Sequence, residues 1–541
     1  MKPYIYLILF LLILGLPFLL RGALTSAPEQ HAQLRLVVVT PHNQDIRREF
    51  GYAFSDWHAK KYGQPVEIDY RTPGGTNDIK RMLENTYAPY RDNDGKLPAD
   101  INADIDIVWG GGDYFFYSEL RKLGSPPMNV LQPIRLDPAI LSAAFPQDRL
   151  AGVRLYDSVK DASGNPLPPT WVGVALSSFG IVYNPDVYAT LNARPAAKKN
   201  PLREPQTWQD LTRPELAGLV ALADPAHSGS AGVAFLMVVQ RRMADAEEGL
   251  LKSRPELAAM PRAEVVKHAD YVAAIAKGWK QGMNDLLLIA ANARYFSDSA
   301  FLVPNDVANG EAAAGMAIDF YGRVYQESVG PNRCRFISPI AATAITPDPV
   351  GILHGVKGQQ YELALHFVEF LLSPQGQRLW ILKPGYPDGP RFRALRRPPI
   401  RRDAYGNRTG WADDVNPFEE AGGFNQRGEW MSTFTDTRMI WAAAWVDSRD
   451  ALQKAYLRIL MIKDIRRRDA LLAELADLPI TLSDVQELPR RMEREAGGNV
   501  DEWRARVRLE WANRFRKHYK QMFDKADEPV KSKRAGQKRI K

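Results

Sequence analysis

The sequence predicts an α/β protein made of two sheet-containing units and a mostly helical C-terminal extension. Between residues 34 and 380, short apolar segments rich in β-branched residues alternate with helical segments, which is typical of parallel βαβ units. The apolar segment 171–183 is too long for one ordinary strand, so we expect it to leave the first unit and enter the second. From residue 396 onward the alternation stops, and Arg, Pro and then helix-forming residues dominate.

The first unit contains three predicted strands, each followed by a helix. The first helix carries Phe50, Phe54 and Trp57 on one face, which predicts that this face is buried. Strands are predicted at 34–39, 66–70 and 104–109, and helices after Asn43, from about Asp78 and over 113–122.

The second unit repeats this alternation before the chain returns to the first unit. Strands are predicted at 219–222, 314–319 and 336–340, and helices at 231–242, 263–282 and near 306–311. The segment DPVGILHGV, from Asp348, is expected to cross back, and an amphipathic helix over 360–372 is expected to end at Ser373. The predicted division is lobe 1 over 34–170 and 345–395, lobe 2 over 171–344, and a helical extension with a basic tail over 396–541.

The N-terminus predicts export from the cytoplasm. Lys2 precedes an uncharged, mostly apolar run over 3–20, so residues 1–27 form either a cleaved signal peptide or a retained membrane anchor. Cys334 is the only cysteine, which excludes an intramolecular disulfide and metal sites built from thiolate clusters. We therefore expect a periplasmic or extracytoplasmic protein, anchored to the inner membrane by 3–20 if that run is retained.

The net charge is +8, and much of the excess lies in the C-terminal tail. A solvated tail is the simplest interpretation of this charge run, and contact with anionic lipid is the alternative. The sequence shows no groove-reading motif, so we expect no nucleic acid partner.

Two turns combine Gly with hydroxyl side chains directly before predicted helices. They are Gly74-Gly75-Thr76 and Ser228-Gly229-Ser230. Free backbone N–H groups and the helix dipole favour an anion at such positions. Ordinary helix capping is the competing explanation for each turn taken alone.

Several segments occur in an order and spacing that resemble a known family. They are VVVTPHN (37–43), PGGTNDIK (73–80), ADIDIVWGGG (103–112), ADPAHSGSAG (223–232), VANGEAAAGMAIDFYG (307–322), DPVGILHGV (348–356) and SPQGQ (373–377). Together they resemble the iron, thiamine and sugar-phosphate branch of the bacterial extracellular solute-binding proteins that serve ABC transporters. The resemblance implies a two-lobed periplasmic-binding-protein fold of type II, with two crossover segments and the ligand between the lobes. The region after 396 lies outside it.

The resemblance also places a set of residues at the ligand. In the predicted roles, Tyr321 donates its hydroxyl, Asp319 accepts a hydrogen bond, Arg323 pairs with phosphate and Trp109 forms an apolar wall. A surface ion pair for Arg323 and core packing for Trp109 are the alternatives. The full set is Thr40, His42, Gly75, Thr76, Trp109, Gly110, Gly111, Ser228, Gly229, Ser230, Asp319, Tyr321 and Arg323.

The predicted ligand is a small polar or anionic solute, with a phosphorylated sugar or a phosphonate favoured. Ferric-ion binders of this branch use adjacent tyrosines where this chain has Phe320-Tyr321, so one phenolate is missing and no metal site is predicted. Ferric ion, thiamine and a polyamine remain alternative ligands, the last two served in part by Asp319, Trp109 and Tyr321.

We predict a binding protein without catalytic residues or cofactor, which delivers its ligand to an ABC transporter permease. The chain has no Gly-x-Ser-x-Gly elbow, HExxH helix or P-loop, and only eight histidines. An enzyme using His227 and Ser228 is one alternative. A membrane-tethered sensor or scaffold, whose 396–541 region binds a partner, is another.

Overall fold

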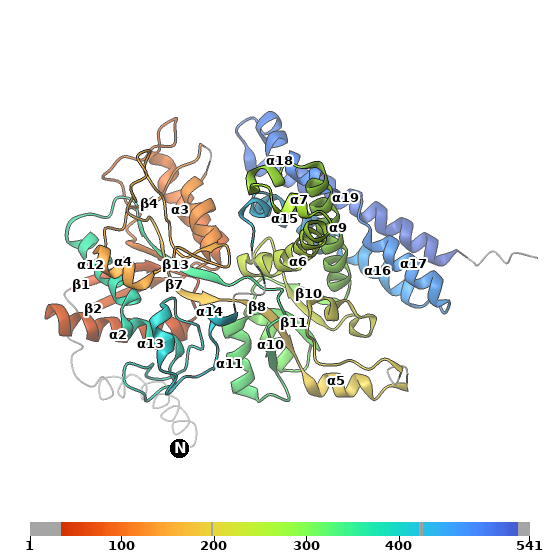
Figure 1. Cartoon of the computed structure of the whole chain (residues 1–541), viewed down its shortest axis with the longest axis horizontal. Coiled ribbons are helices and arrows are strands. Elements are labelled where there is room, and N and C mark those ends of the chain that lie inside the picture. The colour runs from red at the N-terminus through yellow and green to blue at the C-terminus, as the bar shows by residue number, and fades with distance from the viewer. Residues whose placement is uncertain (1–33, 125, 196–198, 421–423, 425, 529–541) are drawn as a thin grey trace, which may run out of the picture.

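The computed structural model describes residues 34–124, 126–195, 199–420, 424 and 426–528. Two lobes, each centred on a β-sheet, lie side by side, and a group of C-terminal helices packs against the second lobe (Figure 1). The predicted leader or anchor over 1–27 and the basic tail after 528 lie outside the described residues.

The first sheet joins strands from both ends of the two-lobed region, in the order β2-β1-β3-β13-β4, with β7 also paired to β13. Strand β1 is parallel to β2 and β3, whereas β13 runs antiparallel to β3, β4 and β7. The strands are β1 Leu34–Val39, β2 Val66–Arg71, β3 Ile107–Trp109, β4 Leu131–Gln132, β7 Val172–Ser177 and β13 Thr346–Leu353.

The second sheet has the order β10-β9-β11-β8-β12, and β5 pairs with β6 in a separate short ribbon. Strands β10, β9 and β11 are parallel, and β8 runs antiparallel to β11 and β12. The strands are β5 Arg149–Leu150, β6 Val153–Arg154, β8 Phe179–Tyr183, β9 Val220–Ala223, β10 Ala293–Ser297, β11 Ala314–Ile318 and β12 Arg335–Ile337.

The chain passes between the sheets twice, first at Ser178 between β7 and β8 and again between Ile337 and Thr346. This confirms the predicted two-lobed α/β fold with two crossover segments. At these crossings the sheet is not parallel, because β7 and β13 pair antiparallel with each other.

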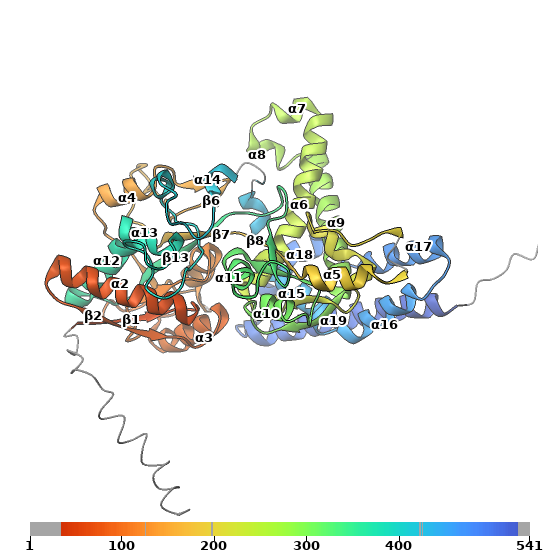
Figure 2. The ribbon, with the colours of Figure 1, turned by 90° about the horizontal axis from the view of Figure 1, so that it is seen from below.

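Helices cover the sheets of both lobes. In lobe 2, the long helices α6 and α9 form a hairpin whose tip, with α7 and α8, projects away from the rest (Figure 2). The helices of the two lobes are α2 Gln44–Tyr62, α3 Thr76–Tyr87, α4 Pro138–Ala144, α5 Pro185–Asn192, α6 Gly229–Ser253, α7 Pro255–Ala258, α8 Arg262–Val265, α9 Ala269–Ala291, α10 Leu302–Ala308, α11 Asp319–Val329, α12 Gly358–Leu372 and α13 Pro374–Ile381.

The helical extension predicted after residue 396 is present, but it does not have a core of its own. Its aromatic residues Trp441, Trp445 and Phe515 belong to the same apolar cluster as Phe235 of α6 and Trp279 of α9. Its helices are α14 Pro417–Glu420, α15 Phe434–Trp441, α16 Arg449–Leu460, α17 Ile465–Ala476, α18 Leu482–Glu495 and α19 Val500–Asp527.

Some predicted elements differ in detail from the structure, and three of these differences have local reasons. The strand predicted from residue 104 begins at Ile107, because Asp104 has a φ of 52° and Asp106 accepts a hydrogen bond from Val37 N through its side chain. The segment predicted as helical over 113–122 is helical, but it forms a π-helix over Phe115–Glu119 and a 3₁₀ helix over Leu120–Lys122. Ser373 ends α12, as predicted, and its hydroxyl also caps the next helix, α13, which starts with Pro374.

Candidate functional site

A cavity of about 770 Å³ lies between the two lobes. Lobe 1 lines it with the turn after β1, the start of α3 and the turn after β3. Lobe 2 contributes the starts of α6 and α11 and the turn before α10, and β13 contributes Asp348. The carboxyl ends of the parallel strands therefore open onto one hollow, as is usual for ligand sites in α/β sheets.

The lobe 1 side of the cavity is built around the N-terminus of α3. Gly75 is the N-cap residue, and its N–H donates to the Asp78 carboxylate over 3.0 Å. Thr76, which is nearly buried, begins the helix and lines the cavity. Because an α-helix leaves its first N–H groups without intrahelical partners, the start of α3 presents donors and a positive dipole end here.

The lobe 2 side is built around the N-terminus of α6. Ser228 caps this helix, with its hydroxyl accepting from Ala231 N over 3.2 Å, so ordinary capping does account for this side chain. The carboxylate of Asp224 stiffens the turn by accepting from Ala226 N at 2.7 Å and by bonding the His227 ring at 3.0 Å. Ser228, Gly229 and Ser230 all line the cavity.

The two helix starts face each other across the cavity. A Cβ atom placed on Gly229 would lie 3.0 Å from the Thr76 hydroxyl oxygen. The Asn77 side-chain amide, next along α3, donates to the carbonyl of Ala226 and, over 3.4 Å, to that of His227. The lobes are thus in contact, and the positive ends of two helices converge on the same space.

At the base of the cavity, three buried residues form a polar cluster. The Asp348 carboxylate lies 2.6 Å from His42 Nε2 and accepts from Arg397 Nη1 over 2.7 Å. Its other oxygen accepts from the backbone of Gly111 at 3.0 Å and of Gly112 at 3.4 Å. Although burial opposes ionisation, Arg397 and His42 hold the pKa of Asp348 well below its usual value, so this carboxylate is charged.

His42 is neutral in this cluster. Burial lowers the pKa of the imidazole below its usual value, against the pull of Asp348. Its Nε2 then carries the proton that Asp348 accepts, while its Nδ1 is buried and has no hydrogen-bond partner among the described residues.

The other predicted residues divide into a group at the cavity and a group behind it. Tyr321 lines the cavity, and its ring packs on Phe320 at 4.2 Å between centroids. Burial raises the pKa of Tyr321 to about 12, so its phenol keeps its proton. Of the thirteen predicted residues, those that line the cavity are His42, Gly75, Thr76, Gly111, Ser228, Gly229, Ser230 and Tyr321.

Four predicted residues lie behind the cavity wall or point away from it. Trp109 is fully buried and packs edge-on against the His42 ring, with centroids 4.4 Å apart. The hydroxyl of Thr40 accepts from His42 N at 3.1 Å. A Cβ on Gly110 would collide with the His42 ring, so the Gly110 backbone lies directly against that ring. The Arg323 guanidinium lies 5.4 Å from the centroid of the Phe336 ring and does not line the cavity.

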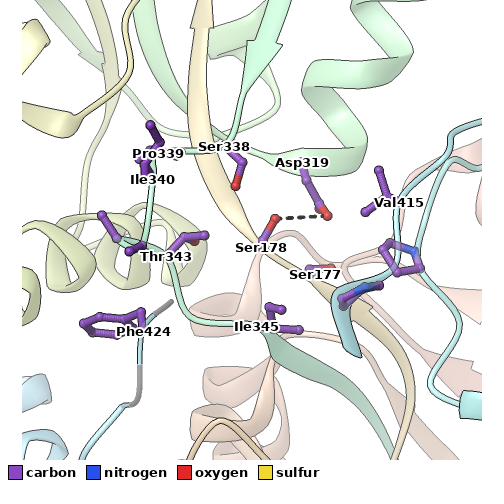
Figure 3. A pocket seen from close by; sticks show the side chains of 14 residues that line it. Ser177, Ser178, Asp319, Ser338, Pro339, Ile340, Thr343, Ile345, Val415 and Phe424 are labelled. Atoms are coloured by element: carbon purple, nitrogen blue, oxygen red, sulfur yellow. Dashed lines mark hydrogen bonds between the residues drawn. The ribbon is translucent and has the colours of Figure 1, made fainter. Parts of the chain in front are cut away.

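Asp319 lines a second, smaller cavity of about 220 Å³ where the crossover segments run together. Figure 3 shows the Asp319 carboxylate and the Ser178 hydroxyl pointing toward each other, 3.4 Å apart. Burial raises the pKa of Asp319 above its usual value. This carboxyl therefore lies beside the crossover segments and does not line the larger cavity between the lobes.

Three residues of the site were missed in the sequence analysis. Asp348 lies in the segment DPVGILHGV, which was used only to place a crossing, and Arg397 lies in the Arg- and Pro-rich stretch taken as the start of the extension. Tyr114, in the turn after β3, lines the cavity and bonds Thr435 of the extension at 2.6 Å. The place of each side chain in the fold, and not its local sequence pattern, reveals its role.

The described residues contain no group of three or more His, Cys, Asp or Glu side chains arranged to hold a metal ion. Within the same residues, no helix has both the length and the apolar composition needed to cross a bilayer.

Solved structures with a similar arrangement are periplasmic binding proteins. AfuA from Actinobacillus pleuropneumoniae, with fructose-6-phosphate bound, is 17% identical, covers 77% of this chain and 98% of its own, and has a TM-score of 0.49. Iron-bound HitA from Pseudomonas aeruginosa is 15% identical, covers 75% and 98%, and has a TM-score of 0.45. No curated protein sequence matches this chain.

One family model matches the sequence itself. It is described as bacterial extracellular solute-binding protein and covers residues 152–413. The matched segment contains the start of α6, Tyr321, Asp348 and Arg397, and so includes much of the cavity lining. Residues 152–413 are therefore similar in sequence to the bacterial extracellular solute-binding proteins.

Proposed function

We propose that this protein is the extracytoplasmic binding component of an ABC transporter, and that its lobes close on a small organic anion such as a phosphorylated sugar or a phosphonate. The observation that carries the proposal is the convergence of the α3 and α6 N-termini on the cavity of about 770 Å³. This volume lies within the range of about 300–1,000 Å³ usual for small-molecule sites. Two helix dipoles and their free N–H groups favour a bound anion over a cation.

The carboxylates around the cavity do not oppose an anion strongly. Asp78 is engaged by Gly75 N, and Asp298 has a side chain 94% exposed to solvent, where water screens it. Burial raises the pKa of Asp113 to about 7, so this carboxyl is partly protonated at neutral pH. Asp348 is neutralised by Arg397.

The site geometry favours binding over catalysis. Ser228, the candidate nucleophile, accepts a hydrogen bond from Ala231 N, while the adjacent His227 ring is directed to Asp224. A nucleophile needs a base within hydrogen-bond reach, and these two side chains have other partners. The chain also offers one tyrosine, Tyr321, beside Phe320, whereas ferric ion prefers several anionic oxygen ligands.

We assign lobe 1 to 34–177 with 346–395, lobe 2 to 178–345, and the extension to 396–541. The pairing of β7 with β13 in the first sheet supports this division, which shifts the boundaries expected from sequence by a few residues. Export to the periplasm, with or without a retained anchor over 3–20, is part of the proposal.

Isothermal titration of the purified full chain tests the function. We expect one saturable site for glucose 6-phosphate or an alkylphosphonate, much weaker binding of glucose, and no comparable binding of thiamine or ferric citrate. Bound ligand stabilises the folded state by about 2.7 kcal/mol at a hundredfold excess over Kd, so the melting temperature should rise with ligand concentration. Tight binding of glucose, thiamine or ferric citrate alone would contradict the proposed anion.

A further inference from the structure

We propose that Arg397 is a ligand-binding residue whose unpaired guanidinium nitrogen holds the anionic group of the solute and sets the preference for an anion. This inference rests on the proposed function and names the group that recognises the charge. Arg397 follows the segment that returns to lobe 1, and it lines the cavity together with the two helix starts.

The side chain of Arg397 is held in one position. It is 5% exposed, and its guanidinium lies over the rings of Phe320 and Trp380, at 4.7 Å and 5.5 Å from their centroids. Its Nε donates to the Ser177 hydroxyl over 3.0 Å, and its Nη1 donates to Asp348 over 2.7 Å. A charged group fixed in this way loses little further entropy when a ligand arrives.

The second terminal nitrogen of Arg397, Nη2, makes no hydrogen bond to the described residues. A guanidinium has five N–H donors in a planar fork. Within the described part of the chain, Nη2 has no hydrogen-bond partner, although the residue lines the cavity. A buried, charged donor that faces a cavity without a partner is the feature expected of a ligand-binding group.

Both carboxylate oxygens of Asp348, the acceptor paired with Arg397, are already occupied. One oxygen of Asp348 accepts from the backbone of Gly111 and Gly112, and the other from His42 and Arg397. With Asp348 ionised and His42 neutral, the cluster has no net charge, both oxygens of Asp348 are engaged, and Arg397 offers the cavity a charged donor. An incoming oxyanion therefore gains a hydrogen bond here, whereas a cationic group does not.

The test compares two buried arginines in the same short stretch. Arg396 is also buried and ion-paired, to Glu327 and Asp413, but it does not line the cavity, so Arg396→Lys is the matched control for Arg397→Lys. Lysine keeps the charge but cannot reproduce the fork. We expect Arg397→Lys to weaken glucose 6-phosphate binding by about 10- to 100-fold while leaving the weak glucose binding unchanged, and Arg396→Lys to leave both unchanged.

Two results separate the possible failures. If the wild-type chain binds glucose 6-phosphate and Arg397→Lys binds it equally well, Arg397 is only a structural link and this inference is overturned, while the proposed function stands. If the wild-type chain binds no anion, both fail. Should the variant not fold, a crystal structure of the wild-type chain with glucose 6-phosphate decides the matter. A phosphate oxygen within hydrogen-bond distance of Nη2 supports the inference, and a phosphate elsewhere in the cavity overturns it.

Discussion

His42 shows how much the function of a single residue depends on its burial. The ring is 7% exposed, lies against Trp109 and donates a hydrogen bond from Nε2–H to the Asp348 carboxylate. Because His42 is neutral, the positive charge of Arg397 and the negative charge of Asp348 cancel, and the cluster has no net charge. A protonated His42 would give the cluster a net charge of about +1. Protonation of His42 would therefore disturb the group that we assign to the anion.

A pH dependence of stability follows from the lowered pKa of His42. Below about pH 6.5 the unfolded chain takes up a proton on this residue while the folded chain does not, so the free energy of unfolding falls as the pH falls. We expect His42→Gln to lose less stability than the wild type between pH 7.5 and pH 5.5, as measured by urea denaturation. Equal losses in the two proteins would show that His42 is charged in the folded state.

The polar cluster is also where the sequence was least informative. Thr76 and Ser228 were predicted because helix starts have a local signature of Gly and hydroxyl residues. Asp348 bonds a residue 49 positions away in Arg397 and one 306 positions away in His42. Contacts between residues so far apart in the sequence leave no local sequence pattern, so they are seen only in the folded chain.

At the scale of elements, the turn after β3 connects the cluster to α3. Gly111 has a φ of 110°, and a Cβ placed there would lie 2.6 Å from Thr76 Cγ2. The next residue, Gly112, has a φ of 82°, but a Cβ there would meet no atom within 4 Å. The two glycines thus share a left-handed backbone and differ in what surrounds them.

This difference predicts separate effects for two substitutions. Gly111→Ala and Gly112→Ala should each lose about 1–2 kcal/mol of unfolding free energy from the left-handed backbone. Only Gly111→Ala should also displace Thr76 and so weaken glucose 6-phosphate binding. Urea denaturation and calorimetric titration measure the two effects. If Gly112→Ala weakened binding as strongly as Gly111→Ala, the position of Thr76 would not be the cause.

At the scale of the whole molecule, the extension links both lobes. Thr435 bonds Tyr114 of lobe 1 at 2.6 Å, and Phe434 packs on the same tyrosine at 4.7 Å. Arg438 donates to the carbonyl of Pro225 of lobe 2 at 2.7 Å, and its guanidinium lies 3.8 Å from Glu119 of lobe 1. The extension therefore contacts the loops on both sides of the cavity.

The two lobes could be predicted from the sequence, because alternating strands and helices identify βαβ units and the long segment 171–183 marks a crossing. Which surface the extension covers could not be predicted. The helical period of apolar residues such as Leu452, Tyr456 and Ile459 shows that one face of the helix is buried. It does not show which part of the protein packs against that face. The structure shows this face within the apolar cluster of lobe 2.

The shared core predicts that lobe 2 and helices α15–α19 unfold together, while lobe 1, most of whose apolar residues lie in other clusters, unfolds independently. Trp445 is fully buried in the shared cluster, stacked on Trp441 and against Phe235. Trp445→Ala should remove about 3–5 kcal/mol from the transition that contains lobe 2 and leave the lobe 1 transition in place.

Differential scanning calorimetry of the full chain distinguishes these transitions. The control is Leu509→Ala on α19, where the side chain is 56% exposed and the change should stay within about 0.5 kcal/mol. If Trp445→Ala lowered only a small transition belonging to the extension, the extension would be a separate folding unit. Lowering of a single transition for the entire chain would instead show that the cavity couples both lobes into one cooperative unit, and the assignment of two independent cores would be wrong.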